Sequence, residues 1–423
     1  MKKILLISLF SFVIPSFSHA AEFKDALIKA YEKANDYKFQ KDQHKSLKAR
    51  NVKAFLGFAP SINAEGSRTY YKNKNVDDIQ RSEEYTSRNI TIRQNIFNGG
   101  RTFANLKKSG EALTQGGDRL KQAEGSVLYN AASSYLEVLL SQEVKKQVSI
   151  KLETLQKFYE SINLRFKLGE VTATDVSQAK ARLSLAEAEM IAANARLDNA
   201  ANNYIKLIGD TPADLKPINF EINVPSSVEE ALRIADKHNH EMRMANSDVK
   251  LAQQDANAAV GRLLPIMDVV GKVDKISGSF STQRKLNKSV VVDIQVPIFN
   301  QGAEYADIFD TQYQKSAQKY RYQKIYEDNI ENVKRAWTKF NSLSSQIIAA
   351  EDAVESARLA FEGTMEEAKI GLKTNIDVLN AEQELYEARI KLLNNKYQKI
   401  LAALEMVNVI GKLDVNFIKT NNL

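Results

Sequence analysis

The chain has 423 residues, 59 lysines and arginines, 52 aspartates and glutamates, a formal net charge of +7 and no cysteine. Acidic and basic residues are interspersed, so no concentrated basic patch indicates a nucleic-acid partner. Without cysteine there is no disulfide and no lipidated N-terminal cysteine. After residue 20 no run approaches the roughly 18 apolar residues of a helical membrane span. Amphipathic β-strands that cross a membrane remain possible, because they contribute little to average hydropathy.

The first twenty residues have the pattern of a secretory signal peptide. Lys2 and Lys3 are followed by an apolar run over residues 4–14, and Ser18-His19-Ala20 places small residues before a cleavage point. An apolar run of this length cannot cross roughly 30 Å of hydrocarbon as a helix. We therefore expect residues 1–20 to be removed and the mature chain to begin at Ala21.

The remainder of the chain is a duplication. An offset of 202 residues aligns 96–209 with 298–411, and an offset of 205 aligns the segments upstream. A repeat of this length defines the architecture of a chain. The alignment predicts a first structural repeat over 21–209, a linker over 210–227, a second repeat over 228–411 and a C-terminal tail over 412–423.

Each repeat is expected to contain a helix, a β-hairpin, a long helix, a tight turn and a final helix. In the first repeat these are 22–56, a hairpin within 57–97 (strands near 61–71 and 85–97), 101–168, 169–172 and 172–208. In the second they are 228–263, a hairpin within 265–299, 303–370, 371–374 and 374–410. Val290, Val292, Ile294 and Val296 alternate with more polar positions, which is the period of a strand.

The long helices carry narrow apolar seams with the spacing of a coiled coil. In the second helix the seam is Ile330, Val333, Trp337, Phe340, Leu343, Ile347, Ala350, Val354, Ala357 and Phe361. In the first helix it is Val148, Leu152, Leu155, Phe158, Ile162 and Phe166. Each long helix would extend about 100 Å. The two shorter helices of a repeat together match that length, which predicts a rod two helices thick.

Such a seam alone also fits a secreted coiled-coil scaffold or an adhesin stalk, and this alternative stays open at the level of periodicity. The hairpins favour another architecture. Four strands per chain are too few to close a barrel, for which about eight strands is the smallest useful number. Exposed strand edges favour pairing between subunits. The fold class expected is therefore mostly α, with a smaller β part that is shared between chains.

Two pairs of motifs extend this interpretation to a family. The strand–helix junctions read "QNIFNGGR" and "VPIFNQGA", and the helical tips read "RFKLGEVTATDV" and "AKIGLKTNIDVLNAE". With the duplicated layout, they make the mature chain resemble the TolC-type outer-membrane efflux proteins. The junction positions are Pro60, Asn98, Gly100, Pro265, Pro297, Asn300 and Gly302.

The resemblance implies a homotrimer whose hairpins form one twelve-stranded barrel in outer-membrane lipid, continued by a helical tunnel through the periplasm. It implies a passive channel for efflux or type I secretion, working with an inner-membrane transporter and a periplasmic adaptor (membrane fusion) protein. No Walker loop, G-x-S-x-G or dinucleotide fingerprint is present, so we expect neither enzymatic activity nor a cofactor.

The resemblance also assigns roles to the tips. The adaptor-docking residues would be Gly169, Glu170, Val171, Thr172, Gly371, Leu372, Lys373 and Thr374. Independently of the family, the glycines suit a turn or a helix C-cap, and the threonines suit N-caps.

The periplasmic entrance constriction would comprise Asp377, Asn380, Lys373, Thr174 and Asp175. Three symmetry-related copies of Asp377 would ring the opening and favour cations, and Lys373 would link neighbouring hairpins through Thr174 and Asp175. Asn380 and Ala368 depart from the family pattern of a second acid and a tyrosine. We therefore expect a weaker gate and less cation block.

His238 and His240 form the nearest approach to a metal motif. Only four histidines are present and no carboxylate or cysteine cluster completes a site. We therefore expect a solvated helix end at this pair and no bound metal.

Overall fold

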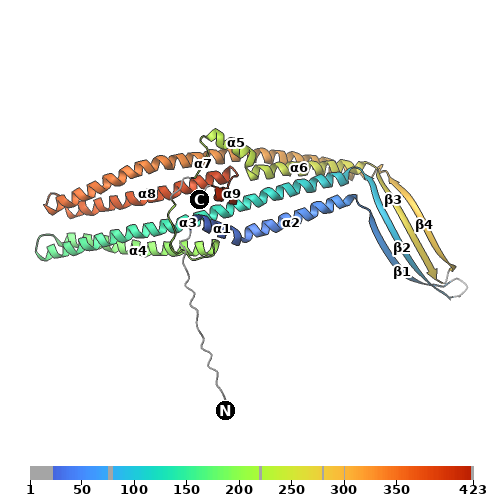
Figure 1. Ribbon diagram of the computed structural model, residues 1–423, viewed down its shortest axis with the longest axis horizontal. Helices are drawn as coiled ribbons and strands as arrows, with labels where there is room; N and C mark the ends of the chain where they lie inside the picture. Colours follow the sequence, from blue (N-terminus) through green and yellow to red (C-terminus); the bar gives the residue numbers. More distant parts are fainter. Residues whose placement is uncertain (1–21, 75–79, 219–221, 279–280, 300, 421–423) are drawn as a thin grey trace, which may run out of the picture.

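In the computed structural model, two very long helices set the length of the molecule. The structure describes residues 22–74, 80–218, 222–278, 281–299 and 301–420. Helix α3 spans Arg101–Lys167 and α7 spans Ala303–Lys369, each with 67 residues. At 1.5 Å per residue, each extends about 100 Å. Figure 1 shows both running from the sheet at one end to helical tips at the other.

Each long helix is accompanied by shorter helices placed end to end. In the tip half, α4 (Ala173–Leu207) lies along α3 and α8 (Asn375–Val409) lies along α7. In the sheet half, α2 (Asn35–Phe55) lies along α3, while α6 (His240–Val260) contacts both long helices (Figure 1). The rod two helices thick that helix lengths predict is therefore present in both repeats.

The first helix of each repeat is broken, whereas the sequence predicts continuous helices over 22–56 and 228–263. In the first repeat α1 (Phe23–Lys33) ends before Ala34, and in the second α5 (Val228–His238) ends before Asn239. Ala34 and Asn239 are equivalent under the 205-residue offset, and both leave the helical conformation, with ψ of 113° and 120°. Each segment then ends in a single 3₁₀ turn, η1 at Leu56–Phe58 and η2 at Gly261–Leu263.

The physical reason for the break lies in the neighbouring helix ends. The last carbonyl groups of a helix have no partner within the helix. Lys33 Nζ donates to the carbonyls of Ile205 and Lys206 at 2.9 and 3.0 Å, at the end of α4. Asn239 Nδ2 donates to the Val409 carbonyl at 2.8 Å, at the end of α8. The break thus places a donor against the terminal carbonyls of the adjacent helix in each repeat.

The two hairpins form one antiparallel sheet of four strands in the order β1-β2-β3-β4. The strands are β1 Ser61–Lys74, β2 Gln80–Asn98, β3 Ile266–Gly278 and β4 Ser281–Gln295. The repeats meet at the β2–β3 pair, where Arg93 binds Asp268 at 3.0 Å. Strands β1 and β2 extend beyond the predicted strands, and Val296 lies after the end of β4. Both outer edges of the sheet, β1 and β4, are unpaired among the described residues.

Burial follows the predicted seams. Every predicted seam residue of α7 is buried or half-buried, as are those of α3 except Phe166 near the tip. The largest buried cluster lies midway along the rod and joins α1, α3, α4 and α8 with the segment after α8. There Tyr135 donates a hydrogen bond to the Lys216 carbonyl at 2.9 Å. The predicted tail contains a short helix, α9 (Val415–Thr420), because Ile418 packs into this cluster.

The predicted signal peptide over residues 1–20 lies outside the described residues. Within the part of the chain that the structure describes, no helix combines the length and apolar character needed to cross a membrane.

Candidate functional site

The two helical tips have the same backbone geometry. In the first, the amide of Gly169 donates to the Phe166 carbonyl and that of Glu170 to the Arg165 carbonyl, both at 3.0 Å. In the second, Gly371 donates to Ala368 at 3.2 Å and Leu372 to Glu367 at 2.9 Å. This is the Schellman arrangement of a helix C-terminus. It requires a left-handed residue, and the glycines have φ of 76° and 81°, so the C-cap prediction is confirmed.

Each tip then starts its next helix with a reciprocal capping box. The Thr172 hydroxyl accepts from the Asp175 amide at 3.2 Å, and Asp175 Oδ2 accepts from the Thr172 amide at 2.9 Å. Thr374 and Asp377 repeat these bonds at 3.3 and 2.9 Å. The threonine caps predicted from the sequence are confirmed. The role of the two aspartates in the caps was missed, although T-x-x-D is a readable signal for it.

The capping bonds also fix the charge of the two aspartates. Hydrogen bonds from Thr172 hold the pKa of Asp175 below its usual value, and bonds from Thr374 do the same for Asp377. A carboxyl whose pKa is lower in the folded state stabilises the fold above its unfolded pKa and loses that effect as the pH falls through the folded pKa. Both tips therefore carry a carboxylate at neutral pH.

The predicted constriction residues come from both hairpins, which contact each other close to the tips. Asn375 Nδ2 donates to Asp175 Oδ1 at 3.4 Å, and Arg182 donates to Asn380 Oδ1 at 3.2 Å. Asn380 thus bonds to the other hairpin. Lys373 and Thr174 are exposed, and Lys373 forms no ion pair with the residues that the structure describes. Within one chain, the residue of the second hairpin that binds Asp175 is therefore Asn375 and not Lys373.

The strand–helix junctions are built from close backbone contacts. Asn98 Oδ1 accepts from the Thr102 amide at 3.2 Å, and Gly100 has a φ of 76°. A Cβ on Gly99 would lie 1.9 Å from the Gly261 carbonyl oxygen, so the two repeats cross here with no room for a side chain. Sequence reasoning missed Gly99 and Gly261.

The other junction positions lie where the repeat predicts. Pro60 and Pro265 directly precede β1 and β3, and Pro297 follows β4. Gly302 has a φ of 80° and precedes α7. Asn300 lies outside the described residues.

The histidine pair lies at the break between α5 and α6. The solvated helix end expected there is wrong for His240, whose Nδ1 lies 3.4 Å from the buried Asp118 carboxylate. Arg243 also binds that carboxylate at 2.8 Å. Among the described residues, no group of three or more histidines, cysteines or acids is placed to hold a metal ion.

Comparison with known proteins identifies the family. The family model described as outer membrane efflux protein matches residues 46–210 and 231–412, which make up most of both repeats. The chain belongs to the outer membrane efflux protein family.

Relatives and solved structures agree with this assignment. The outer membrane efflux protein BepC of Brucella suis is 25% identical over 327 residues, covering 77% of this chain and 72% of BepC. The alkaline protease secretion protein AprF of Pseudomonas aeruginosa is 25% identical over 348 residues, covering 80% and 72% of the two chains. The fold matches the crystal structure of CusC with a TM-score of 0.85 at 16% identity, over 94% and 95% of the chains.

Membership of the outer membrane efflux protein family decides between the two functions considered from the sequence. The matched segments include both hairpins and both tips, so the similarity is not confined to the coiled-coil seam. The chain is an outer-membrane channel protein of efflux or secretion, and the scaffold or stalk alternative is not supported.

Proposed function

We propose that three copies of this chain form a passive exit duct that crosses the outer membrane and extends through the periplasm. The observation that carries the proposal is the open four-stranded sheet at the end of a rod of helices. Unpaired strand edges favour pairing with another chain. Three copies would supply twelve strands, enough to close a barrel.

Exposed apolar side chains on the sheet support assembly with lipid or with other copies. On β4, Val290 is 79% exposed and Val292 is 58% exposed. Contiguous exposed apolar surface in a folded chain indicates an interaction site. In the proposed barrel, one face of β4 meets lipid and its free edge pairs with β1 of the next copy.

At the opposite end, Asp377 is proposed to ring the entrance, with Asn380, Lys373, Thr174 and Asp175 holding the tips around it. The carboxylate of Asp377 is ionised at neutral pH, and only its Oδ2 takes part in the cap. Three such carboxylates around one axis would attract cations. Because Asn380 is uncharged, cation block would depend on this single ring.

Single-channel recording in planar bilayers tests the duct and its entrance together. We expect the purified protein to conduct, divalent cations to reduce the conductance, and Asp377→Ala to relieve that block. Thr374→Ala is the matched control, because it removes the other half of the same capping box and keeps the carboxylate. Absence of conductance contradicts the duct, and block that survives in Asp377→Ala contradicts the ring.

The tips are also proposed to bind a periplasmic adaptor, which in turn contacts an inner-membrane transporter. Leu372 is 71% exposed at the second tip, as expected for a docking residue. The chain has no cysteine, so Leu372→Cys introduces a single crosslinking site. We expect it to capture a membrane fusion protein in cells. Leu359→Cys, also exposed but further from the tip on α7, should not, and equal capture by both variants contradicts docking at the tip.

A further inference from the structure

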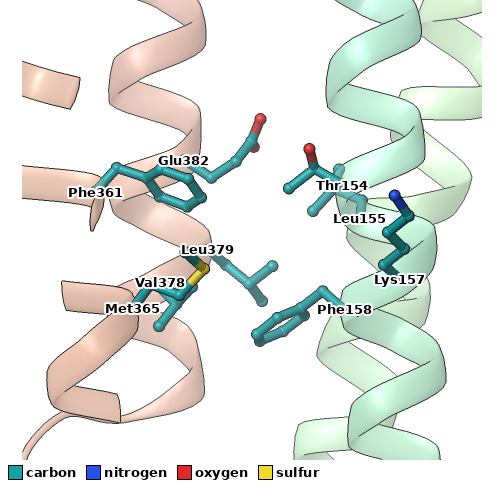
Figure 2. A pocket seen from close by; sticks show the side chains of 9 residues that line it. All are labelled: Thr154, Leu155, Lys157, Phe158, Phe361, Met365, Val378, Leu379 and Glu382. Atoms are coloured by element: carbon teal, nitrogen blue, oxygen red, sulfur yellow. The ribbon is translucent and has the colours of Figure 1, made fainter. Parts of the chain in front are cut away.

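A cavity lies between the two helical hairpins, a short distance from the tips. It has a volume of about 280 Å³ and is bounded by α3 on one side and by α7 and α8 on the other (Figure 2). Its walls are largely apolar, with Phe158 and Leu155 from α3 facing Phe361, Met365 and Leu379. An apolar pocket with a few polar groups is the usual form of a small-molecule site.

One acidic side chain faces this cavity without a partner. Glu382 is only 8% exposed, and its carboxylate points into the space between the hairpins in Figure 2. It accepts no hydrogen bond and forms no ion pair with any residue that the structure describes. Its oxygens are not fully enclosed, yet a largely buried carboxylate without a protein donor is still disfavoured in its charged form. Accordingly, burial raises the pKa of Glu382 to about 7.

The nearest buried cation is already occupied. Lys151 on α3 is 5% exposed and donates to both oxygens of Glu189 on α4, at 2.9 and 3.1 Å. It also donates to Gln383 Oε1 at 2.8 Å, and its ammonium lies 4.2 Å from the Tyr386 ring centroid. These three hydrogen bonds use the three donors of an ammonium group. None is left for Glu382.

Other cations lie around Glu382, and all but Arg389 are bonded to another described residue. Lys157 on α3 also lines the cavity and pairs with Glu153 at 2.6 Å. Arg182 on α4 donates to Asn380. Arg358 on α7 is held between Glu355 and Glu362, at 2.7 and 2.8 Å. Arg389 lies two turns further along α8 and lines an adjoining cavity, but forms no ion pair with the described residues. Glu382 is thus the one acid among the described residues that line the cavity, and it has no hydrogen bond or ion pair there, although Lys151, Arg182 and Arg389 act on its charge from further away.

We propose that this cavity binds a small amphipathic cation, whose apolar body packs among Phe158, Phe361, Met365 and Leu379 and whose ammonium donates to the Glu382 carboxylate. The sign of the ligand follows from the acid, since a cation supplies both the missing donor and the missing charge. The size follows from the volume. A dry cavity of about 150 Å³ accepts benzene, so 280 Å³ suits a body of about two fused rings.

Calorimetric titration tests the proposal with 1-naphthylmethylamine and its neutral analogue 1-naphthalenemethanol, on the full mature protein in detergent. We expect one saturable amine site per chain and binding at least about tenfold weaker for the alcohol. Because the amine binds the ionised acid, affinity should be roughly tenfold higher at pH 8 than at pH 6 for a group with a pKa near 7.

Two variants locate the site. Glu382→Gln should weaken amine binding at least about tenfold and abolish its dependence on pH. Glu384→Gln removes the same charge from an exposed position two residues away on α8 and should bind like the wild type. Equal affinity of Glu382→Gln and wild type overturns the proposal, and so does the absence of saturable binding. Loss of binding in Asp377→Asn with retention in Glu382→Gln overturns it in favour of the entrance carboxylates. None of these readouts depends on conduction or export.

Discussion

At the residue scale, Glu382 is an acid whose largely buried environment opposes its charge. Its pKa is higher in the folded chain than in the unfolded chain, so the folded state binds the proton more tightly. The free energy of unfolding should therefore fall as the pH rises from about 4.5 to about 7 and then level off. A shift of this size corresponds to at most about 3 kcal/mol.

Glu382→Gln should remove that dependence. The variant keeps the shape of the side chain without the charge, so we expect a higher midpoint of denaturation than wild type at pH 8 and the same midpoint at pH 4. Chemical denaturation followed by helical circular dichroism at both pH values measures this. A variant less stable than wild type at pH 8 would show that the carboxylate has a stabilising partner.

The sequence predicted part of this residue-scale picture. Gly169, Gly371 and the two capping threonines are local signals, because a turn and a cap involve residues a few positions apart. Lys151 and Glu382 are charged residues on the buried faces of α3 and α8. Which groups they meet depends on how the two hairpins pack, and no periodicity within one helix encodes that.

At the scale of elements, the break before α6 depends on Asn239. Its Oδ1 accepts from the Met242 amide at 2.9 Å as an N-cap, and its amide group binds the end of α8. Asn239→Ala should lower the free energy of unfolding by about 1–2 kcal/mol. Its equivalent in the first repeat, Ala34, has no capping side chain. Ala34→Asn should therefore raise stability, and thermal denaturation of both variants checks the pair. An Asn239→Ala variant with the same stability as wild type would contradict the capping role.

The crossing of the two repeats at the sheet end gives a second test of element packing. A Cβ on Gly261 would lie 2.4 Å from the Gly99 carbonyl oxygen, whereas one on Gly110 within α3 would meet nothing within 4 Å. Gly261→Ala should therefore destabilise the chain by about 1–3 kcal/mol. Gly110→Ala should stabilise it by about 0.5–1 kcal/mol, because glycine weakens helix interiors. Equal effects in denaturant titrations would contradict the close crossing.

Sequence periodicity predicted the elements well because the length and the apolar seam of a helix depend on residues within that helix. The long helices end within one residue of the predicted ends, and β3 and β4 fall within the hairpin predicted over 265–299. The breaks at Ala34 and Asn239 were missed because their cause is the end of another helix. The Gly99–Gly261 crossing was missed for a similar reason, since the backbone that leaves no room for a side chain at each glycine belongs to the other repeat.

At the scale of the whole molecule, one chain leaves a line of large side chains exposed along the sheet half of α7. These are Tyr305, Phe309, Tyr313 and Tyr320, with exposures of 52% to 76%. Helix α2 exposes Phe39 and Phe55 on the other repeat. Surfaces of this kind and two open sheet edges are expected where copies of one chain surround a common axis. The sequence indicated assembly of several copies through the number of strands. The structure adds which surfaces of α7, α2 and the sheet would lie between the copies.

Single-particle imaging of the purified, detergent-solubilised protein tests the central claim most directly. We predict three chains around one pore, with β4 of each protomer hydrogen-bonded to β1 of the next and the α7 aromatic residues covered by a neighbouring copy. A particle containing one chain, with β1 and β4 still unpaired, would contradict the account.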